Sequence, residues 1–497
     1  MKWLEQAFSD TEAMKQIRDV LSRGEMPLQI NGCVDVQVAH MMYLLGQDCP
    51  LKLIVTYSEE RARKLYEDYH CFDRSVLYYP AKDALFYSAD IHSGVTQSQR
   101  LAVMKQIVET GSATVVTTID GGLDRLLTLE QMRAFCVSLK VEQQLSLTEF
   151  SEQLVDLGYE NVAMVQKPGE YAIRGGILDL FPTGEEAPYR VELWGDEIDT
   201  IRSFDVESQR SIEQVDAITI FPATEMPLTK KRLKMGQIAL EAEYDVCYNQ
   251  YLAERKENEA ANLKYSISGV IEALSTYRLD AGIDSFLPYF YKETASLFDL
   301  FSGEGGRIFL EEPSWVKETL SASMKEFCDS MEDRILGGYM LPGQKEIFYR
   351  EEEIGQRLQH GPIIYFSKIG YRDPAYAAAA EVEFHGQTTN TYRNHFELLL
   401  SDLRRWQKDA YRVMLLCGSD HRGKHLTEEF MEAGLSAYYK EELNDEVAPG
   451  QIAVTVGSIS SGFVYVNEKI VILSEDDIIR RKTKKRRSRA RFKGEVI

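Results

Sequence analysis

Short apolar runs alternate with amphipathic stretches along the first part of the chain, up to about residue 130. Helical patterns cover 10–23, 35–46, 58–69 and 98–110. The apolar runs are MPLQI (26–30), LKLIVTY (51–57), SVLYYP (75–80) and ATVVTT (113–118). Short β-rich runs separated by helices are typical of a parallel sheet wrapped by helices, so the sequence predicts an α/β domain here.

From about 137 to 222 the pattern changes to strands joined by tight turns. The clearest hairpin is YRVELW-GD-EIDTIRSF, in which Gly195-Asp196 forms a two-residue turn that suits the twist of paired strands. Alternation along its first strand places Val191 and Leu193 on one face. Arg190, Glu192 and Trp194 fall on the other face. This segment is therefore expected to form a β-rich domain.

After Pro222 the pattern is helical over 232–275 and returns to an apolar strand, RIFLEE, at 307–312. The first sheet is expected to resume there, which makes the β-rich domain an insertion. A second α/β unit follows, with helices at 394–409 and 420–433 and strands at 411–417, 451–457 and 469–475. The expected division is a split lobe (1–136 and 216–335), an insert (137–215), a linker (336–360), a small α/β domain (361–478) and a basic tail (479–497).

Composition supports several buried cores, because 44% of the residues are hydrophobic and 10% are aromatic. No apolar run approaches the roughly 20 residues that span a bilayer, and the first residues lack a signal-peptide pattern. We therefore expect a cytoplasmic protein with no membrane partner. The seven cysteines are scattered and never spaced as C-x-x-C, so neither disulfides nor a zinc site is predicted.

Charge is distributed unevenly along the chain, whose formal net charge is -21. Residues 480–497 hold ten of the 57 Lys and Arg residues but one of the 78 Asp and Glu residues. The remaining acidic body repels a phosphate backbone over most of its surface. The basic tail is compatible either with a weak nucleic-acid contact or with a solvated linker. Its end suggests that the chain was cut from a longer protein.

The turn after the first predicted strand lacks the residues that bind nucleotide. A phosphate-binding loop G-x-x-x-x-G-K-[ST] needs a second glycine, a lysine and a hydroxyl, but Val34, Asp35 and Val36 follow Gly32. An aspartate in place of the lysine repels a triphosphate. Glu311-Glu312 stands where a helicase would hold magnesium and resembles a decayed version of that site, but acids are also common at the ends of strands. With no H-E-x-x-H or G-x-S-x-G motif either, we predict no catalytic residue, no metal site and no cofactor for this chain.

The most specific motifs lie in the insert, as GEYAIRGGILDLFP (169–182) and PYRVELWGDEIDTIRSFD (188–205). This stretch resembles the module shared by UvrB and the bacterial transcription-repair coupling factor, which that family uses to bind UvrA. Segments 78–104 and 361–478 also resemble the coupling factor. The degenerate phosphate loop and the lack of an aromatic-rich DNA-inserting hairpin favour the coupling factor. A UvrB-like damaged-DNA-binding ATPase or helicase subunit is the alternative.

The resemblance implies a non-catalytic scaffold that recruits UvrA in transcription-coupled nucleotide excision repair. It implies that Arg174, Arg190 and Trp194 contact UvrA, and arginines beside an exposed tryptophan are typical of an interface hot spot. In the other interpretation, Trp194 packs under a neighbouring domain and the arginines pair with acids such as Glu192 or Asp196. The family's whole protein is an ATP-dependent DNA translocase. Its ATP, Mg²⁺, RNA polymerase and double-stranded DNA sites would lie outside this chain.

Overall fold

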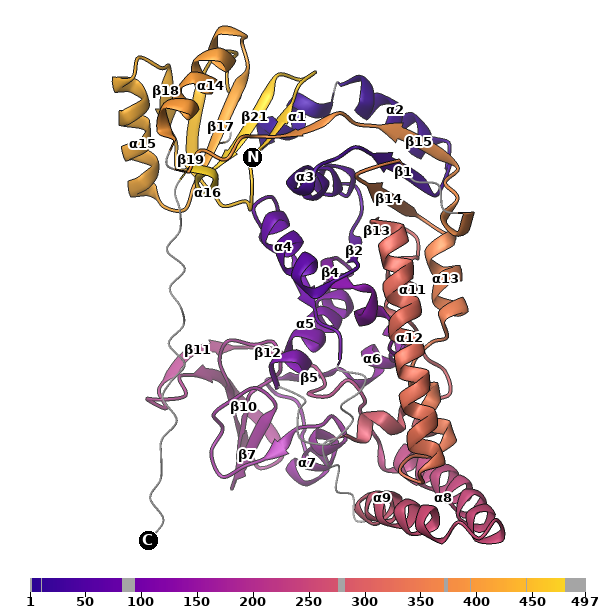
Figure 1. Ribbon diagram of the computed structural model, residues 1–497. Helices are drawn as coiled ribbons and strands as arrows, with labels where there is room; N and C mark the ends of the chain where they lie inside the picture. Colours follow the sequence, from indigo (N-terminus) through magenta and orange to yellow (C-terminus); the bar gives the residue numbers. More distant parts are fainter. Residues whose placement is uncertain are drawn as a thin grey trace, which may run out of the picture.

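The computed structural model describes residues 2–9, 11–82, 94–275, 282–370, 374–393, 395–443 and 445–478. Two sheets flanked by helices lie in the upper part of Figure 1, and a β-rich domain lies below them beside a pair of long helices. The predicted fold class is confirmed: a parallel-sheet α/β lobe carries an inserted β-rich domain and is followed by a second, smaller α/β domain.

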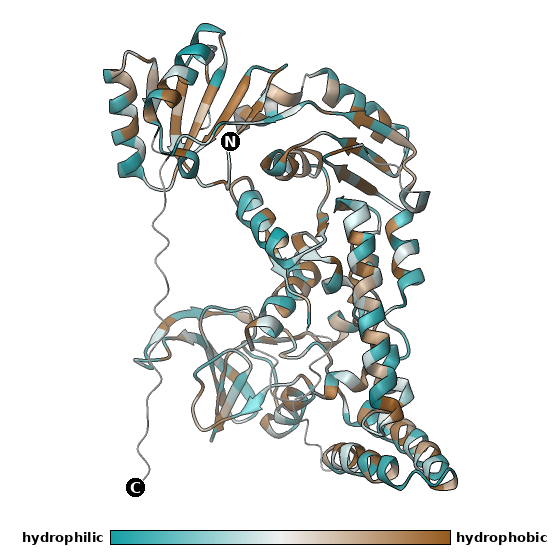
Figure 2. Cartoon of the chain, viewed as in Figure 1, coloured by the Kyte–Doolittle hydropathy of each residue, from teal (hydrophilic) through white to brown (hydrophobic). Residues whose placement is uncertain are grey.

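The first lobe is built on a seven-stranded parallel sheet with the order β15-β1-β14-β13-β2-β4-β3. Its strands are β1 (Leu28–Asn31), β2 (Leu51–Thr56), β3 (Leu77–Tyr79), β4 (Ala113–Thr118), β13 (Gly306–Glu311), β14 (Ile363–Ser367) and β15 (Ala380–Glu383). Every residue of β4 and β14 is buried, as expected for a parallel sheet covered on both faces. The strands are brown in Figure 2 for this reason.

Helices cover both faces of this sheet. They are α1 (Lys2–Ser9), α2 (Glu12–Ser22), α3 (Asp35–Leu45), α4 (Glu59–His70), α5 (Gly94–Thr110), α6 (Leu129–Phe135), α11 (Leu297–Phe301), α12 (Pro313–Leu336) and α13 (Glu351–Gln359). Local sequence sets their ends: the Ser58 hydroxyl accepts a hydrogen bond from the Arg61 amide at the start of α4. Helices α8 (Lys230–Ala253), α9 (Glu257–Ser275) and α10 (Leu287–Phe290) extend the core away from the sheet.

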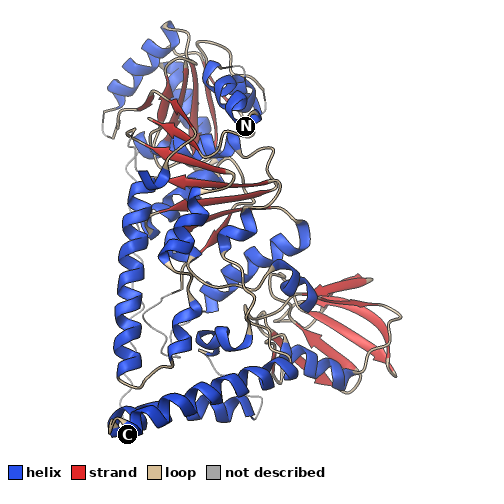
Figure 3. Ribbon diagram, turned by 90° about the vertical axis from the view of Figure 1, so that its right-hand side faces the viewer, coloured by secondary structure: helices blue, strands red, loops and turns tan. Residues whose placement is uncertain are grey.

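The insert contains a six-stranded sheet with the order β11-β10-β9-β8-β7-β6. Its strands are β6 (Glu160–Asn161), β7 (Glu170–Arg174), β8 (Ile177–Leu180), β9 (Tyr189–Trp194), β10 (Glu197–Phe204) and β11 (Ser211–Val215). A separate pair, β5 (Val137–Lys140) with β12 (Ala217–Ile220), and helix α7 (Leu147–Asp156) close one core with the sheet. Figure 3 shows this sheet projecting to one side of the lobe.

The last domain has a six-stranded mixed sheet with the order β16-β20-β21-β17-β19-β18. Its elements are β16 (Gly386–Thr388), α14 (Phe396–Lys408), β17 (Arg412–Cys417), α15 (Asp420–Glu432), β18 (Ala437–Tyr439), β19 (Ile452–Val456), β20 (Phe463–Tyr465), β21 (Ile470–Ser474) and α16 (Glu475–Ile478). Helices α14 and α15 pack on one face. The other face shares a core with the first lobe, in which Met414 and Phe463 pack with residues of β1 and α3.

Several domain limits differ from those expected. Strands β14 and β15 pair with β1 in the first sheet, so the second sheet begins at Gly386 and not near 361. The segment expected to be a linker, 336–360, contains α13 and buries Leu341 and Phe348 in the core of the lobe. Ile218 and Ile220 belong to the core of the insert, which therefore continues past 215. Strand pairing over long sequence separations decides these limits, and local patterns do not encode it.

Two expectations concern residues that the structure does not describe. The basic tail, 479–497, lies outside the described residues, and so do residues 83–93 within the segment 78–104. A nucleic-acid contact by the tail stays a prediction. Within the described residues no helix combines the length and the apolar character needed to cross a bilayer.

Candidate protein-binding site

The outer face of the insert sheet carries the three residues singled out in the sequence. Strand β9 turns its Val191 side chain into the core and presents Arg190, Glu192 and Trp194 on the opposite face. The turn at Gly195, with φ of +65°, pairs Trp194 with Glu197, so the predicted two-residue hairpin is confirmed. Trp194 is 86% exposed at the end of its strand. The other interpretation required Trp194 to pack under a neighbouring domain, and its exposure rules this out.

A buried carboxylate holds Arg190 in place. Asp179 lies opposite Arg190 on the neighbouring strand β8, and its side chain is 4% exposed. Arg190 donates from Nε to Oδ1 at 2.6 Å and from Nη2 to Oδ2 at 2.9 Å. This two-point hydrogen bond raises the pKa of the Arg190 guanidinium and fixes its plane. The guanidinium also lies 4.7 Å from the centre of the Phe204 ring.

Arg174 shares the same carboxylate more loosely. Its Nη2 lies 3.5 Å from Oδ2 of Asp179, and its side chain remains 54% exposed. Two guanidinium groups therefore converge on one buried acid, which leaves a net positive charge on this part of the face. Such an arrangement suits a partner carboxylate, because a second acid would complete the pairing.

Sequence reasoning missed Asp179 as the acid that pairs with the arginines. It had named Glu192 and Asp196, but Glu192 instead pairs with Arg202 on β10. A signal was present in the segment ILDL, because alternation places Asp179 on the face opposite Leu178 and Leu180, both of which are in the core. Ile177, also on the outer face and 37% exposed, adds apolar surface beside Arg174.

A buried charge cluster fixes the insert to the lobe. Arg100 of α5 is fully buried and donates from Nε to Glu225 at 2.9 Å and from Nη2 to Asp124 at 2.5 Å. Lys82 adds a second ion pair to Glu225 at 3.1 Å. Burial opposes ionisation of Glu225, but the two cations lower its pKa to about 2. Glu225 lies just after the last strand of the insert, so this cluster orients the binding face relative to the lobe.

The degenerate phosphate loop is covered by another segment of the chain. Gly32 has φ of +82°, and a Cβ atom there would lie 1.9 Å from the carbonyl oxygen of Phe384, which covers the loop. Asp35 pairs with Lys368 at 2.8 Å. Burial acts to raise the pKa of Asp35, but the hydrogen bond and the charge of Lys368 outweigh it, so the pKa is lowered. The loop therefore has neither an open approach for a phosphate nor the lysine that would bind one.

The acid at the end of β13 is also engaged. Glu311 is buried, accepts hydrogen bonds from Nε of Arg61 at 2.8 and 2.9 Å, and accepts another from Thr56 at 2.7 Å. A carboxylate bound in this way to a guanidinium has little capacity left for magnesium. Elsewhere in the described part of the chain, no group of three or more His, Cys, Asp or Glu residues could hold a metal ion.

Comparisons with known proteins agree with this geometry. Residues 137–226 match the family model of the UvrB interaction domain, which corresponds closely to the insert. Over 87% of its length the chain is 25% identical to the transcription-repair-coupling factor of Bacillus subtilis (strain 168), of which it covers 36%. The proteins of the same name from Staphylococcus haemolyticus (strain JCSC1435) and Staphylococcus aureus (strain bovine RF122 / ET3-1) are 23% and 24% identical over 88% of the chain, which covers 37% of each.

The chain thus spans a little over a third of the length of the curated relatives that it matches. The matches support the resemblance to the N-terminal region of the transcription-repair coupling factor, and they do not favour the alternative of a UvrB-like ATPase subunit.

Proposed function

We propose that this chain is the N-terminal region of a transcription-repair coupling factor and that the outer face of its insert recruits UvrA during transcription-coupled nucleotide excision repair. The observation that carries the proposal is the cluster of Trp194, Arg174 and Arg190 on the open face of a rigid sheet. Exposed tryptophan and arginine side chains are the most frequent hot-spot residues of protein interfaces. The match of 137–226 to a UvrB interaction domain supports the same surface.

The geometry also indicates what the partner presents. An indole that is 86% exposed needs an apolar pocket, and two guanidinium groups that share one carboxylate need a further acid. The partner surface should therefore combine an apolar pocket with one or more carboxylates. Because Arg190 is already fixed by Asp179, it loses little side-chain freedom on binding.

We further propose that this chain works in the cytoplasm as a scaffold without catalysis and that it needs neither ATP nor Mg²⁺ to bind its partner. The loop at Gly32 is covered by Phe384, and Asp35 and Glu311 are paired with Lys368 and Arg61. In the whole protein, ATP hydrolysis, DNA translocation and contact with RNA polymerase would belong to parts outside the region that this chain matches.

The test is a calorimetric titration of the 497-residue chain with UvrA, using Arg174→Ala, Arg190→Ala and Trp194→Ala. We expect each substitution to weaken binding by about 2 kcal/mol, the usual threshold of a hot spot. Matched controls are Arg133→Ala and Trp315→Ala, which remove an exposed arginine and a partly exposed tryptophan on helices α6 and α12. Binding that is unchanged in all three test variants, or weakened equally by the controls, would show that the partner docks elsewhere.

A further inference from the structure

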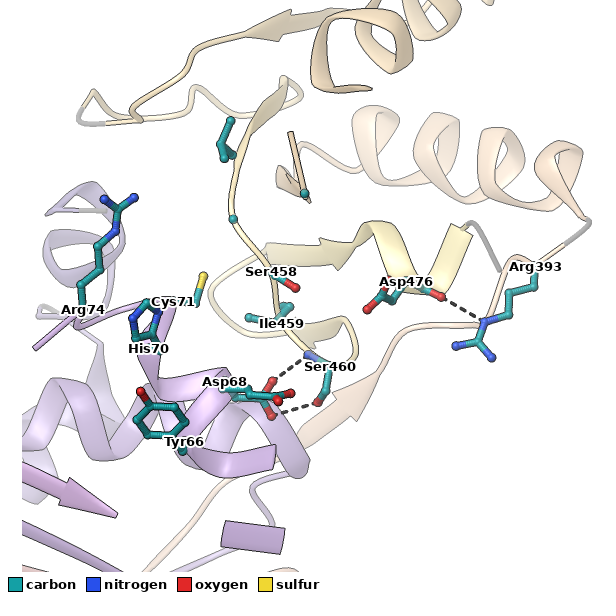
Figure 4. Close-up of a pocket in the computed structure, with 14 residues that line it drawn as sticks. Tyr66, Asp68, His70, Cys71, Arg74, Arg393, Ser458, Ile459, Ser460 and Asp476 are labelled. Atoms are coloured by element: carbon teal, nitrogen blue, oxygen red, sulfur yellow. Dashed lines mark hydrogen bonds between the residues drawn. The ribbon is translucent and has the colours of Figure 1, made fainter. Parts of the chain in front are cut away.

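A crevice of about 1030 Å³ lies where helix α4 of the first lobe meets the last domain. One wall is formed by Tyr66, His70 and Arg74, which follow one another at four-residue intervals along α4 and the turn after it. The other wall is formed by the ends of strands β17 and β19, with Gly418 and Gly457–Ser460, together with Arg393. Figure 4 shows Arg74 and Arg393 on opposite sides of this group of residues.

The position of the crevice follows from the strand connections. Strands β17 and β19 are parallel neighbours, so their carboxyl ends lie at the same edge of the sheet. The connection after β17 leads to α15, which packs on one face, whereas the loop after β19 places Ile459 in the core on the other face. Connections that leave neighbouring strands on opposite faces open a crevice, and open α/β sheets bind ligands there.

The wall of the crevice is rigid. Asp68 of α4 is buried and accepts hydrogen bonds from the amide of Ser460 at 2.6 Å and from its hydroxyl at 2.9 Å. A Cβ atom on Gly457 would lie 3.4 Å from the Cys71 sulfur, so the loop runs close against the helix. Both oxygens of Asp68 are therefore used within the wall, and the two domains are joined directly beside the crevice.

Arg393 offers a place for an anion at one end of the crevice. Nε of Arg393 donates to the backbone carbonyl of Asp476 at 3.0 Å, and the charge of Arg393 also acts on the carboxylate of Asp477. Arg74 and Arg393 are the two arginines among the residues that line the crevice, in a chain with a formal net charge of -21. Glu67 also lines the crevice, and such acids serve as acceptors for ribose hydroxyls in nucleotide sites.

We propose that this crevice binds a small nucleotide, with its phosphate at Arg393 and its base against Tyr66 and His70. Aromatic side chains provide a stacking surface for any base, and arginine is the usual partner of a phosphate. The volume is that of a small-molecule site, and the acidic body disfavours a long polyanion. This site is separate from the covered loop at Gly32, and its occupancy is independent of UvrA binding.

The test is a calorimetric titration of the full 497-residue chain with AMP, ADP, inorganic phosphate and a short oligothymidylate. We expect AMP or ADP to bind without magnesium. Arg393→Ala should weaken nucleotide and phosphate alike by about tenfold or more, since it removes the phosphate contact. Tyr66→Ala should weaken the nucleotide by a similar factor of about ten but leave phosphate unchanged, since it removes only the stacking surface. The control Arg133→Ala removes an exposed arginine on α6 and should change neither.

Three outcomes would overturn the proposal. In the first, neither mononucleotide binds at concentrations up to millimolar. In the second, each mononucleotide binds equally well to the native chain, Arg393→Ala and Tyr66→Ala. Alternatively, only the oligonucleotide binds, with an affinity that falls steeply with salt and ignores both substitutions, as expected for a contact elsewhere. Circular dichroism checks that each variant is folded. Tyr66 is only partly covered and Arg393 is exposed, so replacing either side chain should preserve the fold.

Discussion

Asp179 offers the sharpest test of how the binding face works, because the carboxylate is buried and cannot itself reach a partner. Asp179→Asn keeps the size of the side chain and removes its charge. The amide retains one oxygen acceptor, but its NH₂ group faces the donors of Arg190. Arg190 therefore loses the two-point hydrogen bond that fixes its guanidinium plane.

The expected loss of affinity follows from the side-chain freedom that Arg190 must then give up on binding. Immobilising a flexible side chain at an interface costs about 0.5–1.5 kcal/mol, a cost that Asp179 removes in advance. Asp179→Asn should therefore weaken UvrA binding by about 2- to 12-fold. The insert itself should lose about 2 kcal/mol of stability, the net value of hydrogen bonds to a charged group. Arg174 has only a 3.5 Å contact with Asp179, so its contribution should change less.

The assay is a titration with UvrA at fixed ionic strength, with Glu192→Gln as the matched control. Glu192 lies on the same face but pairs with Arg202 at the surface, where an ion pair contributes less than about 1 kcal/mol. In a chain that already carries Arg190→Ala, Asp179→Asn should have little further effect, because it acts through Arg190. The reasoning is refuted if Asp179→Asn binds as tightly as the native chain, or if the two substitutions add in full.

Two further predictions concern other parts of the molecule. In a phosphate-release assay the chain should hydrolyse no ATP above the buffer background, because Glu311 is bound to Arg61 and has little capacity left for magnesium. Phosphate release that Glu311→Gln abolishes would contradict this prediction. His40 is buried between the first lobe and the last domain, and burial lowers its pKa to about 3, against about 6.5 in the unfolded chain. The unfolded state therefore takes up the proton first as pH falls, so the free energy of unfolding should drop by about 2 kcal/mol between pH 7.5 and pH 5 because of His40. Urea unfolding of His40→Gln at both pH values checks this, and an equal pH dependence in variant and native chain would show that His40 is not the cause.

Sequence reasoning placed individual elements well because local patterns determine them. The helix predicted at 420–433 is observed as α15, which begins at Asp420. The pairing of Gly195-Asp196 as a two-residue turn and the face on which Trp194 lies also follow from local alternation. These features depend on residues within a few positions of one another, which the sequence displays directly.

By itself, the sequence determined the α/β class, the inserted β-rich domain, the loss of the phosphate-binding lysine and the outward face of β9. Only the tertiary structure decided which acid meets Arg190, since Asp179 and Arg190 are brought together by strand register. It also decided that β14 and β15 join the first sheet, and that α4 and the loop after β19 form a crevice. Pairing across hundreds of residues depends on the packing of the whole chain, and no local pattern records it.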